Sequence, residues 1–412
     1  MKFIHAADLH LDSPLRGLER YEGAPAEVIR GATRRALENL VELALREEVA
    51  FVVIAGDVYD GDWQDYNTGL FFVAQMRRLT SARIHVFLIR GNHDAASQMS
   101  RQLRLPEGVH LFDHRKATTV QLKDLGVAVH GQSFGNRAVP ENLVPDYPKP
   151  VAGCFNIGLL HTSADGRPGH EPYAPCKVAD LVAKGYDYWA LGHVHEREVL
   201  HETPWVVFSG IVQGRHARET GAKGCTLITV DDGEVTRVEA CELDVVRWSV
   251  LSVDADGAAS LTELLDRVRE ALADAITAAD GRLVAARVQI SGATEMHQVL
   301  LGAQEAFVGE CRNLANEFGG EVWLEKVKVQ TRPMTPLEDL AKQGDAVGEL
   351  LLFLRSAGED EALLEQSVAG LTGLSGKVDR LNFDAAWARA ELPEIERLLA
   401  VRLAERGEEG AA

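Results

Sequence analysis

The sequence lacks any apolar stretch long enough to cross a membrane. Its apolar runs, such as Leu350–Leu354, fall far short of the ~20 residues that a membrane-spanning helix requires. The first residues, MKFIHAADLH, contain one lysine and read directly as a strand, without the apolar region and small-residue cleavage site of a signal peptide. We therefore expect a cytoplasmic protein with no membrane span.

Cysteine and positive charge are also scarce. The five cysteines are widely separated and none belongs to a CxxC pair, which argues against a disulfide framework or a zinc knuckle and fits reduced thiols. Lys and Arg number 43 against 62 Asp and Glu, so the formal net charge is −19. Because nonspecific DNA affinity comes mostly from basic side chains that displace counterions, this charge argues against a broadly basic DNA-coating surface. Metal ions and a few clustered bases would have to bind any polyanion.

The chain is too long for one compact core, since single cores stop growing at about 250–300 residues, so we expect two or three domains. Residues 1–246 form the first predicted domain. Amphipathic stretches with helical spacing cover Val28–Glu48 and Tyr66–Leu79. Short apolar runs, each ending in a polar turn, alternate with them: KFIHAADLH, VAFVVIAGDVYD, RIHVFLIRGNHD, FNIGLLHTSAD, YDYWALGHVH and PWVVFSGIVQG. This pattern predicts an α/β fold with polar groups at the carboxyl ends of its strands.

Residues 247–334 follow a different pattern. Two helical stretches, Leu261–Ala279 and Glu295–Phe318, alternate with three strand-like runs, which predicts a small α+β domain. Residues 335–412 read as a helical region that ends in an apolar stripe. The stripe comprises Leu392, Ile395, Leu398, Leu399 and Leu403. It fits either a helix packed within this protein or a helix that docks onto a partner.

Five of the turns after predicted strands carry residues that can bind metal ions. A single Asp or His after a strand is usually a turn or helix-cap residue, but five such loops in one chain predict a shared crevice. Its carboxylate, amide and imidazole groups would suit Mn²⁺, Fe²⁺ or Zn²⁺. A carboxylate that bridges two ions is also needed for a dinuclear site, and Asp57 is the natural candidate. The residues are Asp8, His10, Asp57, Asn92, His93, His161, His193 and His195.

The ordered set Asp-x-His, Gly-Asp-x-x-Asp, Gly-Asn-His-Asp, His and Gly-His-x-His resembles the pattern of calcineurin-like metallophosphoesterases. The resemblance implies a four-layer α/β sandwich, extended here by the small α+β domain and the C-terminal helices. It also implies two divalent ions, with Mn²⁺ expected first and Fe²⁺ or Zn²⁺ as alternatives. One ion would be held by Asp8, His10, Asp57 and His195, and the other by Asp57, Asn92, His161 and His193.

The same resemblance implies roles for residues beside the ligands. His93 would donate a proton to the leaving oxygen or stabilise charge there. Asp94 would orient the His93 ring, or else serve as an ordinary helix N-cap. Some related nucleases carry a histidine where Asp60 stands, so we expect Asp60 to act through other residues and not by touching the phosphate. Gly56, Gly91 and Gly192 stand beside the ligands and would permit their tight turns.

Other segments point to a substrate class. The N-terminal MKFIHAADLHLDSPL, with GDVYDG and GNHD, resembles the SbcD group of DNA exonucleases, and Gly210–Cys225 with His130–Gly135 resembles its YhaO-like subgroup. The likeness covers about the first 245 residues well, whereas beyond them only the order of elements agrees. It implies a DNA exo/endonuclease subunit in DNA repair, a small domain that caps the site, and C-terminal helices that dock an SbcC-like coiled-coil ATPase. A homodimer is a further expectation drawn from the family.

One cationic cluster lies near a ligand-bearing loop and comprises Arg215, His216, Arg218 and Lys223. It could contact nucleic acid, or it could serve as solvated charge or in structural hydrogen bonds. Two other functions stay open. The acidic charge would suit a phosphodiesterase or phosphatase for small nucleotides, and the C-terminal helices would suit a non-catalytic scaffold, although a scaffold has no use for eight convergent polar side chains.

Overall fold

A computed structural model describes residues 1–13, 25–60, 66–96, 103–166, 173–334, 342, 346–369 and 384–396 of the chain. The chain divides into two compact units. The first comprises residues 1–251, 270–288 and 314–326, and the second comprises the described parts of 252–269, 289–313 and 327–412. The predicted domain boundaries at residues 246 and 334 stay predictions.

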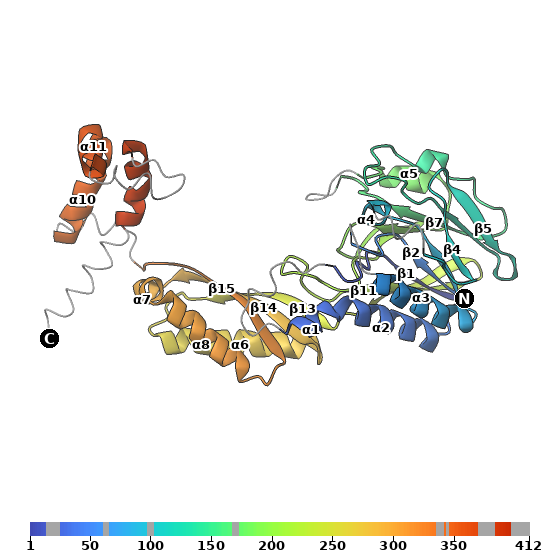
Figure 1. The fold of residues 1–412 in the computed structure, drawn as a ribbon, viewed down its shortest axis with the longest axis horizontal. Helices are drawn as coiled ribbons and strands as arrows, with labels where there is room; N and C mark the ends of the chain where they lie inside the picture. Colours follow the sequence, from blue (N-terminus) through green and yellow to red (C-terminus); the bar gives the residue numbers. More distant parts are fainter. Residues whose placement is uncertain are drawn as a thin grey trace. The chain divides into compact units, whose positions relative to one another are not determined.

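Two sheets lie at the centre of the first unit (Figure 1). In the described residues the first has the order β12 (Glu234–Glu242), β11 (Gly224–Asp231), β1 (Lys2–Ala6), β2 (Phe51–Ile54), β3 (His85–Leu88), β4 (Val109–Leu111). The second has the order β5 (Thr118–Leu122), β6 (Val127–Gly131), β7 (Phe155–His161), β8 (Tyr188–Gly192), β10 (Trp205–Phe208), β9 (Glu198–Glu202). Strands β1 to β4 are mutually parallel, as are β6, β7, β8 and β10, so their carboxyl ends share an edge in each sheet.

Aromatic residues join the inner faces of the two sheets. The Phe3 ring stacks on Phe51 with centroids 4.9 Å apart and meets the edge of Tyr188 at 5.3 Å. All three side chains are fully buried, and burying a large apolar side chain contributes about 1.5–3 kcal/mol. This contact fixes β1 and β2 of one sheet against β8 of the other, and so brings their carboxyl ends together.

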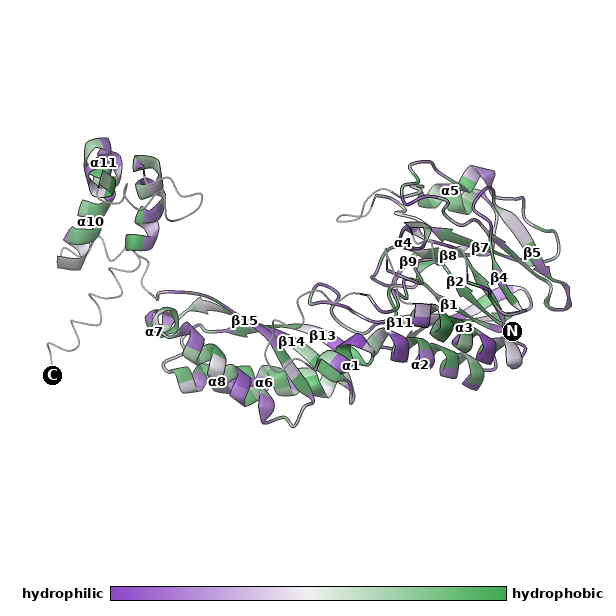
Figure 2. Cartoon of the chain, in the orientation of Figure 1, coloured by the Kyte–Doolittle hydropathy of each residue, from purple (hydrophilic) through white to green (hydrophobic). Residues whose placement is uncertain are grey.

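Helices cover the two outer faces. α2 (Ala32–Arg46) and α3 (Tyr66–Ser81) pack on the first sheet through a shared apolar core, whereas Ile29 of α1 (Ala26–Arg30) packs in a separate core with Trp248 and Trp323. α5 (Val178–Ala183) and the 3₁₀ turn η4 (Val144–Asp146) cover the second. The ribbon of α2 carries both hydrophobic and hydrophilic residues along its length (Figure 2). Layers of helix, sheet, sheet and helix result, which confirms the predicted α/β sandwich.

The stretch predicted as one helix over Val28–Glu48 is two helices, because the backbone is interrupted at Gly31. Two short elements complete this part of the chain. They are the 3₁₀ turn η3 (Lys123–Leu125) and helix α4 (Asn92–Ala96).

The next region forms a sheet of order β13 (Val246–Asp254), β14 (Leu283–Ala293), β15 (Val322–Arg332). Its helices are α6 (Leu261–Ala279), α7 (His297–Gly302) and α8 (Gln304–Asn316), in the predicted β-α-β-α-β sequence. The boundary between the two units falls within the three strands. In the first unit, Trp248 of β13 and Trp323 of β15 pack edge to face, with centroids 6.0 Å apart, and share a core with Ile29 and Ala217.

Helices also form in the C-terminal region. They are α10 (Ala346–Glu359), α11 (Glu361–Ala369) and a helix over residues 385–396. Leu392 of the predicted stripe packs against Leu364 and Val368, whereas Ile395 is 39% exposed. The stripe residues Leu398, Leu399 and Leu403 lie outside the described residues. Among the described helices, none combines the length and apolar character needed to cross a membrane.

Candidate metal centre and active site

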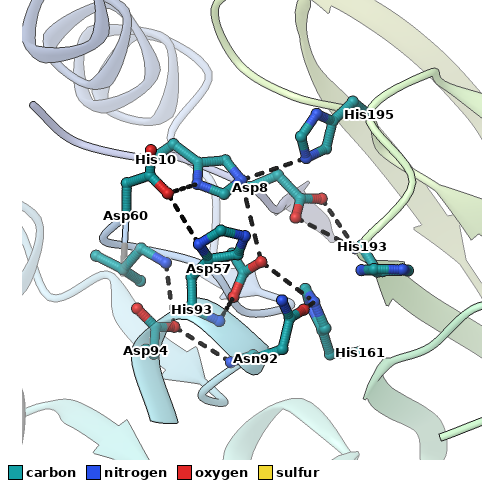
Figure 3. A network of polar contacts seen from close by, with 12 residues as sticks. Asp8, His10, Asp57, Asp60, Asn92, His93, Asp94, His161, His193 and His195 are labelled. Carbon is teal, nitrogen blue, oxygen red and sulfur yellow. Dashed lines mark hydrogen bonds and ion pairs between the residues drawn. The ribbon is translucent and has the colours of Figure 1, made fainter. Parts of the chain in front are cut away.

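The predicted ligands meet where the carboxyl edges of the two sheets face each other (Figure 3). Asp8 and His10 follow β1, Asp57 follows β2, and Asn92 begins α4 after β3. From the other sheet, His161 ends β7, and His193 with His195 follows β8. The loops that sequence analysis singled out therefore converge, as open α/β sheets place their functional groups at the carboxyl ends of strands.

The backbone of these loops is held in an uncommon conformation. Asp8, His10 and Asp57 have φ angles of 52°, 41° and 51°, and His193 has a φ of 98°. Non-glycine residues with positive φ cost of the order of 1–3 kcal/mol and persist only where the surroundings enforce them. Here the Asp8 N–H donates to the Gly56 carbonyl and the His10 N–H to the Asp57 carbonyl, each at 3.0 Å. These four positive-φ residues are among those whose side chains converge at the site.

Glycines beside the ligands make the close approach possible. A Cβ atom on Gly91 would lie 2.3 Å from Oδ1 of Asp57 and 2.7 Å from Cε1 of His161. A Cβ atom on Gly192 would lie 2.0 Å from the Ala55 carbonyl oxygen. Neither position has room for any side chain, so glycine is required by the ligand packing itself.

One cluster of candidate ligands contains Asp8, His10 and His195, whose donor atoms all lie within 4.8 Å of one another. The Nε2 atoms of the two histidines are 3.2 Å apart, and Oδ2 of Asp57 lies 4.0 Å from Nε2 of His10. Nitrogen lone pairs and carboxylate oxygens that face each other repel unless a proton or a cation lies between them. The donor set of this cluster fits a divalent ion of the Mn²⁺, Fe²⁺ or Zn²⁺ type.

A second cluster lies on the other side of Asp57. Nε2 of His161 is 3.4 Å from Oδ2 of Asp57 and 2.9 Å from Oδ1 of Asn92. The Nδ1–H of His161 donates to the Ala55 carbonyl at 2.9 Å, which directs Nε2 toward these oxygens. The His193 ring lies 5.2 Å from the His161 ring, and its backbone N–H donates to the Asp8 carboxylate at 3.0 Å. Asp57 thus lies between two donor sets, where a bridging carboxylate would be required.

The two carboxylates at the centre respond oppositely to their surroundings. Burial raises the pKa of Asp8 to about 6, against the attraction of His195 and His161. Burial acts in the same direction on Asp57, but the charge and hydrogen bond of His161 hold its pKa well below the usual range. Burial would lower the pKa of His161, yet Asp57 raises it to about 9. A proton on His161 therefore compensates the buried carboxylate, as a divalent ion would when bound.

His93 lies beside this centre and remains partly accessible, with 31% of its side chain exposed. Its Nδ1 atom is 2.8 Å from Oδ1 of Asp60, and its backbone N–H donates to Oδ1 of Asp57 at 2.9 Å. Burial opposes protonation of His93, but Asp60 and Asp57 outweigh it and raise the pKa of the ring. His93 can therefore hold a proton beside the converging donor atoms, as a general acid must.

The contact expected of Asp94 is made by Asp60 instead. The Asp94 carboxylate accepts hydrogen bonds from the backbone N–H groups of Val58, Tyr59 and Gly91, at 3.1, 2.9 and 3.2 Å. It thereby holds the loop after β2 against the loop after β3. We correct the proposed ring-orienting role of Asp94 accordingly: Asp94 shapes the loops, and Asp60 contacts the His93 ring.

Sequence analysis missed Glu219. Its Oε1 atom lies 2.7 Å from Nδ1 of His195, and the residue is buried, with 7% exposure. The carboxylate accepts the Nδ1–H proton, so Nε2 is the nitrogen directed toward His10. The segment RHARETG shows only mixed charges in sequence. Nothing in it distinguishes Glu219 from a solvated glutamate, since His195 lies 24 positions away.

The four cationic residues suggested for nucleic-acid contact divide into two pairs. Arg215 bonds Glu219 at 3.1 Å and Asp60 at 3.4 Å, and Lys223 bonds Glu196 at 2.6 Å. The side chains of Arg215 and Lys223 are only 14% and 4% exposed, so both residues serve in ion pairs within the protein. His216 and Arg218 are exposed on the same segment.

The arrangement can position a phosphate ester and supply a proton to it. When bound, two divalent ions would lower the pKa of a water molecule and neutralise charge on the phosphate. Of the chain's own residues, Asp57 lies between both donor sets. The Ala55 carbonyl orients the imidazole of His161, and Glu219 orients that of His195. His93, held by Asp60, lies at the accessible side with a proton available for a leaving oxygen.

Comparison with known proteins places the chain in a family. The family model "Calcineurin-like phosphoesterase" matches residues 1–197, and "Metallophosphoesterase YhaO, middle domain" matches residues 248–332. A Bacillus subtilis (strain 168) protein described as "Uncharacterized metallophosphoesterase YhaO" is 36% identical over 274 residues, which cover 66% of this chain and 67% of the relative. The chain belongs to the calcineurin-like phosphoesterase family and is accordingly a phosphoester hydrolase.

Two solved structures are also similar. The protein TT1561 of Thermus thermophilus is 14% identical, with 59% of this chain and 98% of that chain covered and a TM-score of 0.34. A dimetal phosphatase from Danio rerio is 13% identical, with 56% and 93% covered and a TM-score of 0.35.

Proposed function

We propose that this protein is the nuclease subunit of a DNA-processing complex and hydrolyses phosphodiester bonds in DNA with two divalent ions, Mn²⁺ first among them. Asp8, His10, Asp57 and His195 would hold one ion, and Asp57, Asn92, His161 and His193 the other. His93 would protonate the leaving oxygen. The observation that carries the hydrolytic part is the position of Asp57, which lies 4.0 Å from His10 and 3.4 Å from His161, between two donor sets.

The choice of DNA rests on the sequence resemblance to SbcD-like nucleases in MKFIHAADLHLDSPL and Gly210–Cys225. The partly exposed His93 also supports a long substrate, because a proton donor for a polymer must be reachable from the surface. His216 and Arg218, both exposed, are the residues of the cationic cluster available for phosphate contacts.

An SbcC-like ATPase is the proposed partner, and a homodimer is a further proposal. Support for a docking surface comes from α10, where Leu352 and Phe353 are 54% and 57% exposed. Exposed large apolar side chains on one helix suit contact with a second protein. The reduced thiols suit a cytoplasmic location, because all five cysteines are free.

A small-nucleotide phosphodiesterase is the second candidate. The net charge of −19 favours it, together with the engagement of Arg215 and Lys223 by acidic side chains, since both weaken attraction for a polymeric anion.

A substrate panel separates the two functions. Purified protein with Mn²⁺ is incubated with end-labelled single- and double-stranded DNA, with and without the ATPase, and with cyclic and linear nucleotides. We expect DNA cleavage that Asp57→Asn abolishes. High kcat/KM on a nucleotide, with no DNA cleavage even beside the ATPase, would establish the second candidate instead.

A further inference from the structure

The segment from Gly210 to Gly224 wraps around His195 by backbone and side-chain contacts. The Ile211 N–H donates to the His195 carbonyl at 3.0 Å, and the Gly224 N–H donates to the Ile211 carbonyl at 3.2 Å. At the ring, Glu219 lies 2.7 Å from Nδ1. The segment therefore fixes both the main chain and the side chain of a proposed metal ligand.

Within this segment, Glu219 is fully used by protein partners. One carboxylate oxygen faces the His195 ring, and the other accepts the backbone N–H of Arg215 at 2.7 Å. The Arg215 guanidinium adds a contact to Oε1 at 3.1 Å. A buried carboxylate held on both oxygens cannot turn, so the ring that it contacts cannot turn either.

Arg215 joins this carboxylate to a second one. Its Nη1 atom lies 3.4 Å from Oδ2 of Asp60, while Nη2 contacts Glu219. Asp60 in turn contacts the His93 ring at 2.8 Å. The fork of one guanidinium therefore spans the residue that orients a metal ligand and the residue that orients the proposed proton donor.

The backbone next to Arg215 is also fixed by contacts. The carbonyl of the preceding Gly214 accepts the indole N–H of Trp248 at 3.0 Å, and a Cβ atom on Gly214 would lie 2.6 Å from the Glu219 carbonyl oxygen. Trp248 is buried against Trp323. The backbone at Arg215 is thus anchored in an apolar core of the first unit.

We propose that Glu219 and Arg215 are positioning residues that hold the His195 and His93 rings as one unit, with Glu219 setting the affinity of the ion bound by His195. The inference rests on the proposed dinuclear site and deepens it. Neither residue would touch the substrate. Their effect would be to keep Nε2 of His195 directed toward His10 and to keep Asp60 in place beneath His93.

Metal binding to the full chain tests this directly. Mn²⁺ is titrated calorimetrically into wild type, Glu219→Gln and Arg215→Lys, with Glu234→Gln and Arg83→Lys, at exposed positions, as matched controls. Loss of a histidine-orienting partner typically costs about 10–100-fold in metal affinity. We expect Glu219→Gln to weaken one of two sites by that factor, Arg215→Lys to weaken the same site less, and the controls to match wild type.

Cobalt supplies a readout that a general loss of stability does not reproduce. The visible absorption of bound Co²⁺ depends on ligand geometry, so Glu219→Gln and Arg215→Lys should change the spectrum, whereas Glu219→Asp should restore part of it. The double variant should lose little more metal affinity than Glu219→Gln alone, since both residues affect this ion through the His195 ring. Unchanged affinity and an unchanged Co²⁺ spectrum in folded Glu219→Gln would overturn the proposal, and so would fewer than two ions in the wild type.

The outcome is separable from that for the proposed function. Two ions in the wild type, weakened by Glu219→Gln, with no DNA cleavage by either protein would support the positioning role and refute the nuclease. DNA cleavage by the wild type, together with metal affinities that Glu219→Gln and Arg215→Lys leave unchanged, would support the nuclease and refute the positioning role.

Discussion

The Nδ1 atom of His93 lies 2.8 Å from the Oδ1 atom of Asp60, three positions beyond Asp57. With Nδ1–H donated to that carboxylate, Nε2 is the ring nitrogen left to meet a leaving oxygen. Asp60 also lies 3.7 Å from Nδ1 of His10 and receives Arg215 at 3.4 Å. Asp60, a residue outside both proposed ligand sets, therefore contacts both the proposed proton donor His93 and the proposed metal ligand His10.

His93→Ala should lower kcat on a phosphodiester by about 10²–10⁴-fold, the usual contribution of a positioned proton donor. The bound Mn²⁺ should stay at the wild-type level, because no proposed ligand is removed. Steady-state kinetics on bis(p-nitrophenyl) phosphate and metal analysis of the same sample measure both quantities. Asp60→Asn keeps the ring and should be less severe. Wild-type turnover by His93→Ala would refute the assigned role.

Divalent ions should stabilise the fold, and Asp57 should be essential for that effect. At an ion concentration near 100 times Kd, each independent site adds about 2.7 kcal/mol to the free energy of unfolding. We expect Mn²⁺ to raise the Tm of the wild type, and a chelator to reverse that rise and abolish activity. The Tm of Asp57→Asn should respond neither to Mn²⁺ nor to the chelator. Asp231→Asn, at an exposed strand end, serves as the control. A normal Mn²⁺ shift in Asp57→Asn would exclude a bridging role.

Gly91→Ala should disrupt the centre although it adds a single methyl group. The new Cβ would overlap Oδ1 of Asp57 at 2.3 Å and Cε1 of His161 at 2.7 Å, so both side chains must move. We expect reduced Mn²⁺ affinity and a loss of about 1–3 kcal/mol of stability, as overpacking costs elsewhere. Gly309→Ala is the matched control, because its Cβ in α8 meets nothing within 4 Å and alanine favours the helix. Equal metal affinity in the two variants would contradict the predicted steric overlap at Gly91.

His5 should make stability depend on pH. Its Nε2–H donates to the Leu191 carbonyl and the Tyr188 hydroxyl donates to Nδ1, each at 3.1 Å, and burial lowers its pKa from 6.5 to about 3. Between these two values the unfolded chain binds a proton that the folded chain does not. The contribution of His5 to the free energy of unfolding is therefore fully present above pH 6.5. It is lost as the pH falls toward 3, by up to about 1.4 kcal/mol per pH unit.

Urea unfolding of wild type and His5→Gln at pH 7 and pH 5 measures how much of the pH dependence of stability comes from His5. The variant should be less stable at pH 7, and the difference between the proteins should shrink at pH 5. A difference that stays constant would mean that the His5 ring does not titrate as its burial demands.

Several strands could be predicted because they are buried on both faces. Phe51–Ile54 and Tyr188–Gly192 are continuous apolar runs, and every residue in them is buried. The edge strand β12 was not predicted, since most of Glu234–Glu242 is polar or exposed and its pairing with β11 depends on the completed sheet. Gly31 was likewise passed over, because a single glycine is tolerated inside a helical pattern.

The sequence identified the residues that converge at this centre, but not the residues that hold them in place. Asp57 and His161 each end a recognisable strand–loop motif, so residue type and place identify them. Asp94 is next to His93 in sequence but turns to the backbone of Val58, whereas Asp60 reaches the ring from another loop. Adjacent residues in a helix such as α4 point in different directions, and sequence spacing does not show that Asp60 reaches the His93 ring from another loop.

By itself, the amino-acid sequence determined the α/β layering and the set of oxygen and nitrogen donors at the strand ends, because both follow from local runs of residue types. Only the tertiary structure decided which nitrogen of His195 faces the site, what holds His93, and that Arg215 joins Glu219 to Asp60. These contacts join loops up to 155 positions apart, and hydrogen bonds depend on distances that exist only once both sheets have packed.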